Sequence, residues 1–271
     1  MQEAKTIPQA YAPLILHQKM KWCGSLWRIL ILSSIVVLSA WYTGLLDAKR
    51  LQEGIPSIIG LIRDGMPPNF HDARSWFRPL VDTFAMSIAG TALAVTISLP
   101  LSLLGARNTS PHPVVYLAAR GILNGLRSIP ELIMGILFVA AVGFGALPGV
   151  LALGLHSVGM VGKFFAESIE HASEGPIEAV KSSGASPLQV ILHGILPQVV
   201  PHMADVIIYR WEYNFRASTV MGMVGAGGIG FELMSSLRIM QYQDVSAILL
   251  VILVMVTIVD GSGSFLRKRF K

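Results

Sequence analysis

The chain has 271 residues, of which 53% are hydrophobic and 14% are charged, against roughly 25% charged residues in a typical soluble domain. This composition excludes a water-soluble globular protein, because its surface could not be covered with polar groups. The net charge of +5 does not indicate nucleic-acid binding, because the basic residues lie at the ends and turns of apolar segments, as in membrane proteins. A single cysteine, Cys23, excludes an internal disulfide framework and a cysteine metal cluster.

Apolar segments close to the ~20 residues that cross a bilayer recur along the chain. The first, residues 24–46, is too long for a signal peptide and lacks a nearby small-residue cleavage site, so we expect a retained helix. The other predicted spans are residues 81–104, 126–147, 149–169, 199–224 and 245–265. The sequence therefore predicts an all-α membrane protein with six transmembrane helices, divided into an N-terminal part (1–79) and a core of five transmembrane helices (80–271).

The distribution of Lys and Arg predicts that both termini are cytoplasmic. Basic residues are concentrated in the N-terminal segment (Lys5, Lys19, Lys21 and Arg28) and in the C-terminal tail (Arg267, Lys268, Arg269 and Lys271). The loop at 47–79 would then be external, although it carries basic residues too, mixed with acidic ones. Its apolar stretch at 55–62 is too short to span, and we expect it to lie at the membrane interface.

Residues 174–198 have the local pattern of two short helices separated by a sharp bend. Pro176 suits the first turn of a helix, and Gly184 suits its end, where a left-handed residue is favoured. Ser186 can cap a second helix, with Pro187 at its first position and Gln189 completing a capping box. We expect a helix-turn-helix that faces the cytoplasm and serves as a docking element.

This segment resembles the cytoplasmic loop of ABC importer permeases, whose pattern is E-A-A, three residues, Gly, nine residues, I-x-L-P. The positions that match at the family's spacing are Glu178, Ala179, Gly184, Leu196 and Pro197, whereas Val180 and Gly194 depart from the pattern. The resemblance implies a type I ABC importer permease fold. It also implies that the short helix of this loop seats in a groove of a partner ATPase and transmits the closure of that ATPase to the spans.

A narrower resemblance covers residues 80–271. The segments at 127–145 (RSIPELIMGILFVAAVGFG), 167–186 and 209–230 (YRWEYNFRASTVMGMVGAGGIG) look like permeases of phosphonate and phosphite importers. This resemblance implies a multi-pass protein of the bacterial inner membrane that works with a second copy of itself, two ABC ATPase subunits and an extracytoplasmic binding protein. It implies a phosphorus oxyanion as cargo, delivered by that binding protein. Methionine-importer permeases share part of the VGAGGIG pattern, so methionine or phosphate is the alternative cargo.

Ionisable side chains interrupt the predicted spans, and each costs at least ~2.5–3.5 kcal/mol at mid-bilayer unless it faces protein or water. They occupy all positions but Asn124 and Met160 of three stripes at helical spacing: 205/209/212/216, 120/124/127/131 and 156/160/163/167. From these spans we take as candidate pathway residues Arg210, Glu212, Asn214, Arg216, Arg127 and Glu131. Glu212 with Arg216, and Arg127 with Glu131, are also predicted i,i+4 ion pairs that could be structural only. Arg210 has no such partner on its own helix and is the best candidate to attract an anion, while His156 alone favours a hydrogen-bonded interior histidine.

A glycine-rich turn follows the fifth predicted span, with candidate gate positions at Gly225, Gly227, Gly228 and Gly230. It lacks the G-K-[ST] ending of a phosphate-binding loop, so we expect no cofactor in this chain, with ATP and Mg²⁺ held by the partner ATPase. Glycine permits positive φ and close backbone approach, which favours an external-side turn that lines or gates the pathway.

Two other classes fit the sequence less well. An integral membrane enzyme would need an acid and base pair or a metal cluster, and the chain has neither H-E-x-x-H nor a Ser-His-Asp context, so we expect no catalytic residues and no metal. A secondary transporter would typically show inverted repeats, which are not recognisable here.

Overall fold

A computed structural model describes residues 12–270 of the chain and places side chains from residue 26 to residue 269. Two of the basic residues used for the orientation, Lys5 and Lys271, lie outside the described residues. The chain separates into two compact units, residues 1–63 and 64–271, which are described in turn. The division predicted at residues 79 and 80 stays a prediction.

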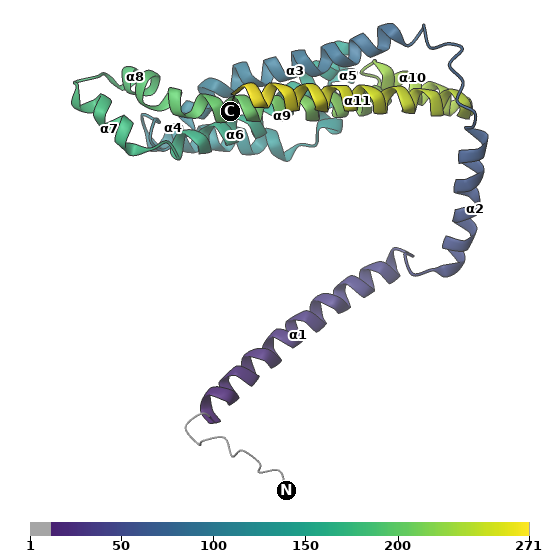
Figure 1. Ribbon diagram of the computed structural model, residues 1–271, viewed down its shortest axis with the longest axis horizontal. Coiled ribbons are helices and arrows are strands. Elements are labelled where there is room, and N and C mark those ends of the chain that lie inside the picture. The colour runs from purple at the N-terminus through teal and green to yellow at the C-terminus, as the bar shows by residue number, and fades with distance from the viewer. Residues whose placement is uncertain (1–11, 271) are drawn as a thin grey trace. The chain divides into compact units, whose positions relative to one another are not determined.

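The first unit consists of two helices, α1 (Ala12–Tyr42) and α2 (Ala48–Asp64), labelled in Figure 1. Asp47 begins α2, because its carboxylate accepts hydrogen bonds from the backbone N–H groups of Lys49 and Arg50. The stretch predicted to lie at the membrane interface, 55–62, belongs to this longer α2, none of whose residues is buried.

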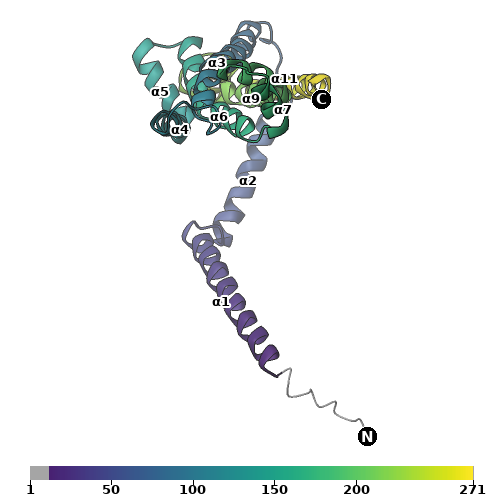
Figure 2. The same ribbon diagram turned by 90° about the vertical axis from the view of Figure 1, so that its left-hand side faces the viewer.

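The second unit is a helical bundle arranged around one central helix. Its elements are α3 (Phe77–Leu104), α4 (Pro113–Ser128), α5 (Glu131–Val142), α6 (Ala146–Glu170), α7 (Glu174–Ser182), α8 (Pro187–Gln189), the π-helix η2 (Val190–Ile195), α9 (Leu196–Met221), the 3₁₀-helix η3 (Gly222–Val224), α10 (Ile229–Arg238) and α11 (Tyr242–Phe270). Helix α6 is the most buried of the long helices and contacts α3, α4, α5 and α9. Seen along the bundle, α4 and α5 lie on one side and α11 on the other, with α3, α6 and α9 between them (Figure 2).

Glycines on α6 explain its close contact with its neighbours. A Cβ atom at Gly159 would lie 2.6 Å from the backbone nitrogen of Arg127 in α4, and one at Gly154 would lie 3.3 Å from the carbonyl oxygen of Gly90 in α3. Helices in lipid associate through such close packing of small residues, because lipid tails are as apolar as the side chains they would replace. The central position of α6 therefore follows from its small residues.

Four helical segments are long and apolar enough to cross a membrane: α3, α6, the continuous helix Pro187–Val224 and α11. They confirm the predicted spans at 81–104, 149–169, 199–224 and 245–265. The pair α4 and α5 forms a fifth if the bent pair is one span. Among the described residues of α1, Leu26–Tyr42 form a shorter apolar helix that does not reach this length.

The span predicted at 126–147 is not one continuous helix. Helix α4 ends at Ser128, α5 begins at Glu131, and the two axes are bent by 86°. The cause is Pro130, because the residue before a proline is pushed out of the helical region, and Ile129 has ψ of 120°. The stripe predicted at 120/124/127/131 is therefore not one helix face.

Candidate functional site

A chain of hydrogen bonds crosses the core of the bundle from α9 through α6 to α3. The Nε of Arg210 donates to Ser157 Oγ at 2.7 Å, and Ser157 Oγ donates to Asn214 Oδ1 at 3.0 Å. Asn214 Nδ2 then donates to Thr91 Oγ1 at 2.9 Å. All four side chains are buried. The polar atoms that make these three hydrogen bonds thus replace the water that they lose on burial with a specific partner.

A second group of polar side chains joins α5, α6 and α9 beside the first. The Tyr213 hydroxyl donates to Glu131 Oε1 at 2.7 Å, and His156 Nε2 lies 3.3 Å from Glu131 Oε2. The other ring nitrogen of His156 lies 3.0 Å from the carbonyl oxygen of Ile129. This carbonyl is available because α4 ends at Ser128 and leaves it without a helical partner. The proline break therefore creates the polar contact.

Arg210 connects the two groups, which together we call the Arg210 cluster (Thr91, Glu131, His156, Ser157, Arg210, Tyr213 and Asn214). Its guanidinium carbon lies 4.2 Å from the centre of the Tyr213 ring, and the residue is only 2% exposed. Its Nη2 is buried and has no hydrogen-bond partner among the side chains that the structure describes. The arginine predicted to attract an anion thus lies behind Tyr213, with one donor unused.

The other predicted pathway charges form a separate set of contacts, and the ion pair predicted between Glu212 and Arg216 is wrong. Arg216 Nη1 lies 3.0 Å from Asp260 Oδ1, and Arg267 Nη1 lies 2.9 Å from Glu212, with both partners on α11. Gly263 on α11 lets Glu212 approach, because a Cβ atom there would overlap its carboxylate. The charges of Glu212 and Arg216 are therefore balanced by the neighbouring helix α11 and not by each other.

The ion pair predicted between Arg127 and Glu131 is also wrong. Arg127 lies in the last turn of α4 and is exposed. Glu131 begins α5 on the far side of the bend and contacts Tyr213 and His156. The interior hydrogen bonds predicted for His156 are confirmed, although sequence reasoning missed Glu131, Ser157 and Tyr213 as members of one cluster. The available signal was the proline that breaks the helix just before Glu131.

One cavity of about 230 Å³ opens between α5 and α9 at the edge of the Arg210 cluster. Its polar lining comes from Glu131, Tyr213 and Arg216, and its apolar lining comes from Leu132, Ala217, Val220 and Met221. A cavity with a few polar groups on an apolar wall is the usual form of a small-molecule site. The cavity brings three charged or polar groups from two helices to one open space.

The loop between α6 and α9 has the predicted caps. Helix α7 ends just before Gly184, which has φ of +80°, and Ser186 and Gln189 form the capping box. The second short helix is not separate, which differs from the prediction: six residues of π-helix (Val190–Ile195) join it directly to α9. The end of the loop and α9 therefore form one continuous helix from Pro187 onward.

The loop also presents the residues of the matched pattern on its surface. Glu178, Ala179, Gly184 and Pro197 are exposed, and Leu196 is half-buried. Ile177 holds α7 against the bundle as a buried member of its apolar core. The departure at Gly194 has a structural reason, because a Cβ atom there would lie 3.3 Å from Ile177 Cα. We call this surface, Glu174–Pro197, the docking loop.

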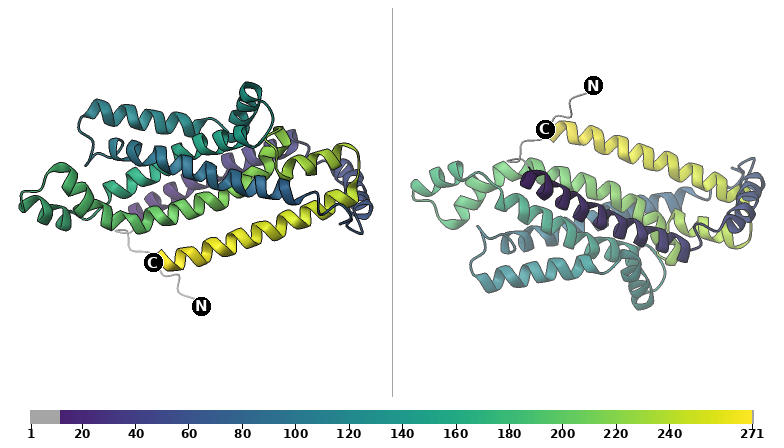
Figure 3. Two further views of the ribbon diagram at one scale, coloured as in Figure 1. Left: turned by 90° about the horizontal axis from the view of Figure 1, so that it is seen from above. Right: turned by 90° about the horizontal axis from the view of Figure 1, so that it is seen from below.

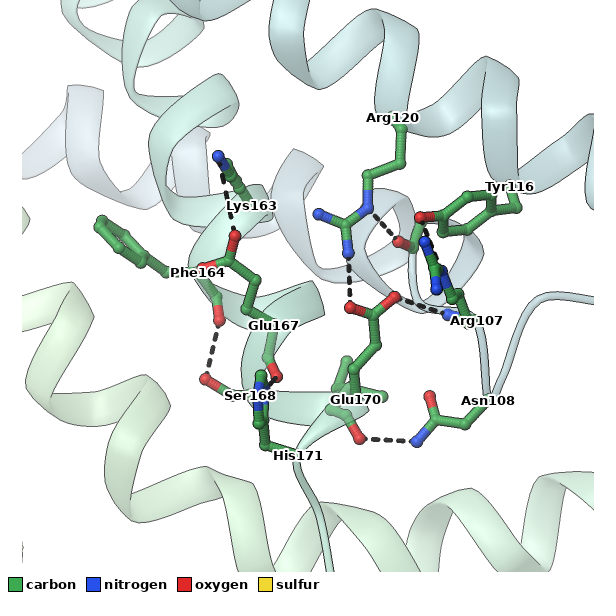
Figure 4. Close-up of polar contacts among 12 residues, drawn as sticks. Arg107, Asn108, Tyr116, Arg120, Lys163, Phe164, Glu167, Ser168, Glu170 and His171 are labelled. Atoms are coloured by element: carbon green, nitrogen blue, oxygen red, sulfur yellow. Dashed lines mark hydrogen bonds and ion pairs between the residues drawn. The ribbon is translucent and has the colours of Figure 1, made fainter. Parts of the chain in front are cut away.

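A polar network fastens the end of α6 next to the docking loop, as Figure 4 shows. Glu170 Oε2 lies 2.9 Å from Arg120 Nη2, and Glu170 Oε1 accepts a hydrogen bond from the backbone nitrogen of Arg107. Asn108 donates to the carbonyl oxygen of Ile169 at 2.7 Å. Arg120 also donates to the carbonyl oxygen of Gly105. These bonds tie the connection between α3 and α4 to the point from which the docking loop starts.

The glycine-rich turn lies at the opposite end of α9 and has the predicted backbone. Gly225, Gly227 and Gly228 have positive φ, from +73° to +98°. Gly230 lies inside α10, where a Cβ atom would overlap the carbonyl oxygen of Thr219. The turn therefore depends on glycine at all four predicted positions. Its proposed gate role stays a prediction.

Comparison with known proteins identifies the family of the chain. Residues 98–271 match the model of the family described as "Binding-protein-dependent transport system inner membrane component". The chain belongs to this family, which makes it a permease subunit of an ABC transporter and a multi-pass protein of the inner membrane. Members of this family act together with an ATPase and a substrate-binding protein.

Individual relatives are similar over most of the chain. The phosphite transport system permease protein of Stutzerimonas stutzeri is 68% identical over 92% of this chain and 91% of the relative. The phosphate-import permease protein of Mycolicibacterium smegmatis is 43% identical over 81% of this chain and 41% of the relative. Among solved structures, a methionine ABC transporter in an inward-facing conformation matches with a TM-score of 0.63 at 20% identity, covering 72% of this chain and 96% of that one. The structural match supports the fold of a type I ABC permease.

Proposed function

We propose that this chain is the permease of an importer for phosphite or a phosphonate. The observation that carries this proposal is the 68% identity to a phosphite transport permease over nearly the whole of both chains. Methionine is the less favoured cargo, because the methionine transporter supports the fold alone at 20% identity. In this proposal an extracytoplasmic binding protein delivers the oxyanion, and ATP and Mg²⁺ are held by the partner ATPase.

The proposed assembly pairs this chain with a second copy, and places membrane lipid around both. In the proposed topology α1 is a sixth span and both termini face the cytoplasm. The basic residues on the described part of the C-terminal tail, Arg267, Lys268 and Arg269, support this orientation. The docking loop and the C-terminus would then lie on the same side, which agrees with Figure 3, where the docking loop and the C-terminal end of α11 lie toward the same half of the bundle.

In the proposed mechanism the docking loop and the Arg210 cluster are coupled through α9. The ATPase would bind the exposed face that carries Glu178, Ala179 and Gly184, and its closure would move the Pro187–Val224 helix, which carries Arg210 and Tyr213. The cluster and the nearby cavity would be the charge-selective part of the pathway, and the glycine turn would be its gate. Positive charge attracts an anion, while a wet and only partly charged wall permits its release.

Uptake by the reconstituted complex tests the cargo. We expect a complex of this chain with its ATPase and binding protein in proteoliposomes to take up phosphite, and an excess of a phosphonate to compete more strongly than methionine. Uptake of methionine, with no uptake of phosphite, phosphonate or phosphate, would contradict the proposal.

Cysteine labelling tests the topology. In a Cys23→Ser background, Asp64→Cys places a thiol at an exposed position that the proposal assigns to the external side. We expect a membrane-impermeant maleimide to label it in intact cells. Labelling that appears only after the membrane is permeabilised would overturn the six-span topology without affecting the family assignment.

A further inference from the structure

The contact between Glu131 and His156 requires one hydrogen more than a neutral imidazole and an ionised carboxylate supply. The Nδ1 atom of His156 lies 3.0 Å from the carbonyl oxygen of Ile129, which can only accept a hydrogen bond. Nδ1 must therefore carry a hydrogen. In a neutral imidazole the other nitrogen, Nε2, would then present a lone pair to Glu131 Oε2 at 3.3 Å.

Among the side chains placed between residues 26 and 269, no other neighbour of the carboxylate relieves this contact. The Tyr213 hydroxyl already donates to the second oxygen, Oε1, at 2.7 Å. The side chains of His156 and Glu131 are 10% and 24% exposed, so water screens the repulsion between the two lone pairs weakly. A proton on Nε2 removes the repulsion and turns the contact into a pair of imidazolium and carboxylate. The geometry thus calls for one extra proton inside the bundle.

Two helices supply the polar groups next to this pair. Helix α9 contributes Tyr213, which bonds to Glu131, and Arg210, which lies over the Tyr213 ring, while α6 contributes the neutral Ser157, which bonds to Arg210. With the proton, the pair has no net charge and Arg210 leaves the cluster at +1. Without it, the pair has a charge of −1 that offsets Arg210. The proton therefore decides whether the cluster attracts an anion.

The same pair forms part of the wall of the cavity of about 230 Å³. Glu131 and Tyr213 line this cavity, together with Arg216. A bare carboxylate at this position would repel an entering oxyanion and would hold the Tyr213 hydroxyl for itself. A carboxylate paired with an imidazolium repels the oxyanion less and holds the Tyr213 hydroxyl less tightly, because its charge is already balanced. Arg210 behind Tyr213 adds positive charge and one unused donor.

Building on the proposed function, we propose that Glu131 and His156 share one proton that makes this cavity a binding site for a phosphorus oxyanion. The Tyr213 hydroxyl turns from Glu131 to donate to an oxygen of the anion, and Glu131 stays paired with the imidazolium of His156. The proton remains on the pair throughout, so no bond other than hydrogen bonds forms or breaks. Glu131 and His156 are specificity-determining residues in this proposal, and Tyr213 is the residue that contacts the anion.

Nitrogen NMR of the imidazole tests the shared proton without any transport. We expect both ring nitrogens of His156 to carry hydrogen at neutral pH in the full-length chain in lipid nanodiscs, with His156→Gln identifying the signal. In Glu131→Gln we expect only Nδ1 to carry hydrogen, because the amide can donate to Nε2 in place of the proton. An unprotonated Nε2 in the wild-type chain would overturn the inference.

Uptake by a double variant tests the consequence for the anion. His156→Leu removes the imidazolium that balances the charge of Glu131 and leaves only the Tyr213 hydrogen bond to its carboxylate, and we expect phosphite uptake to fall at least about tenfold, which corresponds to ~1.4 kcal/mol. Glu131→Gln removes the charge, so the double variant His156→Leu/Glu131→Gln should recover uptake to within about threefold of Glu131→Gln alone, or ~0.7 kcal/mol. Equal amounts of assembled complex and equal stimulation of the ATPase by the loaded binding protein are the control for folding.

The two proposals fail in different ways. A wild-type complex that takes up no phosphorus oxyanion refutes the proposed function, while the NMR result still decides whether the proton is shared. Wild-type uptake together with a double variant that stays as impaired as His156→Leu refutes the oxyanion site alone. Recovery in the double variant supports it, because a purely structural role of His156 would not be repaired by a second substitution on another helix.

Discussion

The Arg210 cluster and the docking loop place their polar residues in opposite ways. In the cluster, Arg210 and Asn214 are buried and bonded to partners more than 50 residues away in the sequence. In the docking loop, Glu178 and Gly184 are exposed, and the bonds that shape the loop, such as the capping box of Ser186, span three residues. The cluster is therefore organised by the whole bundle, whereas the loop is organised locally and leaves its surface free for a partner.

Gly184→Arg should give the largest loss of uptake and should leave the Arg210 cluster intact. Gly184 has φ of +80° and is exposed, so arginine adds bulk and charge to the face that the ATPase would bind. We expect uptake to fall to background while the complex loses ATPase stimulation. Gly184→Ala is the matched control, because it carries the same backbone strain of roughly 1–2 kcal/mol without the bulk. Equal uptake in the two variants would show that strain and not docking causes the loss.

Arg210→Gln should give the next largest loss, and its cause should lie in the cluster. Glutamine can still bond to Ser157 but brings no charge to the cavity, so we expect uptake to fall at least about tenfold, or ~1.4 kcal/mol. Assembly and ATPase stimulation should persist. Arg216→Gln is the comparison, because Arg216 is 44% exposed and already paired with Asp260, and we expect a smaller loss. Wild-type uptake in Arg210→Gln would make its charge structural only.

Ser157→Ala tests how much the buried hydrogen bonds of the Arg210 cluster contribute to the stability of the bundle. It removes the acceptor of Arg210 and the donor to Asn214, and leaves both buried groups short of a partner. We expect a loss of about 1–3 kcal/mol in the free energy of unfolding, measured by thermal unfolding in detergent. Ser182→Ala in the exposed α7 is the matched control and should cost less than about 0.5 kcal/mol. Equal effects at the two serines would contradict the difference between the two regions.

The smallest effects should come from the ion pairs between α9 and α11. The loss of unfolding free energy should be larger for the pair whose carboxylate is more buried. The side chain of Glu212 is 7% exposed, whereas Asp260 is 44% exposed. Asp260→Asn should therefore cost no more than about 1 kcal/mol in unfolding free energy, and Glu212→Gln should cost more. Thermal unfolding of both variants in the same detergent measures the difference. A larger loss in Asp260→Asn would mean that burial does not set the strength of these pairs.

The sequence predicted local features well and long-range partners poorly. The capping box at Ser186 and the positive φ of Gly184 and Gly225 follow from residue types within a few positions, so the pattern alone was sufficient. The partners of Glu212 and Arg216 were sought four residues away, but they lie on α11, 55 and 44 residues later. Helical spacing shows which side chains share a face and does not show which helix packs against that face.

The bend before Glu131 was missed although its local signal lies in the sequence. Pro130 lies within the predicted span at 126–147, but this segment carries few charges, so composition favoured one continuous span. The backbone preference before proline outweighs this continuity, and the bend of 86° brings Glu131 to His156 and Tyr213. The conflict between the proline rule and the apolar span therefore marked the position of the candidate site.

The ion pairs between α9 and α11 also constrain the order in which the protein is made. Arg216 and Glu212 are synthesised well before Asp260 and Arg267, which balance them. An unpaired charge on an inserted helix costs roughly 2.5–3.5 kcal/mol. Helix α9 is therefore poorly suited to lipid until α11 has emerged from the ribosome, and the two helices are expected to enter the bilayer together. A nascent chain that stops after α9 and before α11 would expose unpaired charges in the membrane. Membrane quality-control proteases could use these charges to distinguish unfinished copies from finished ones.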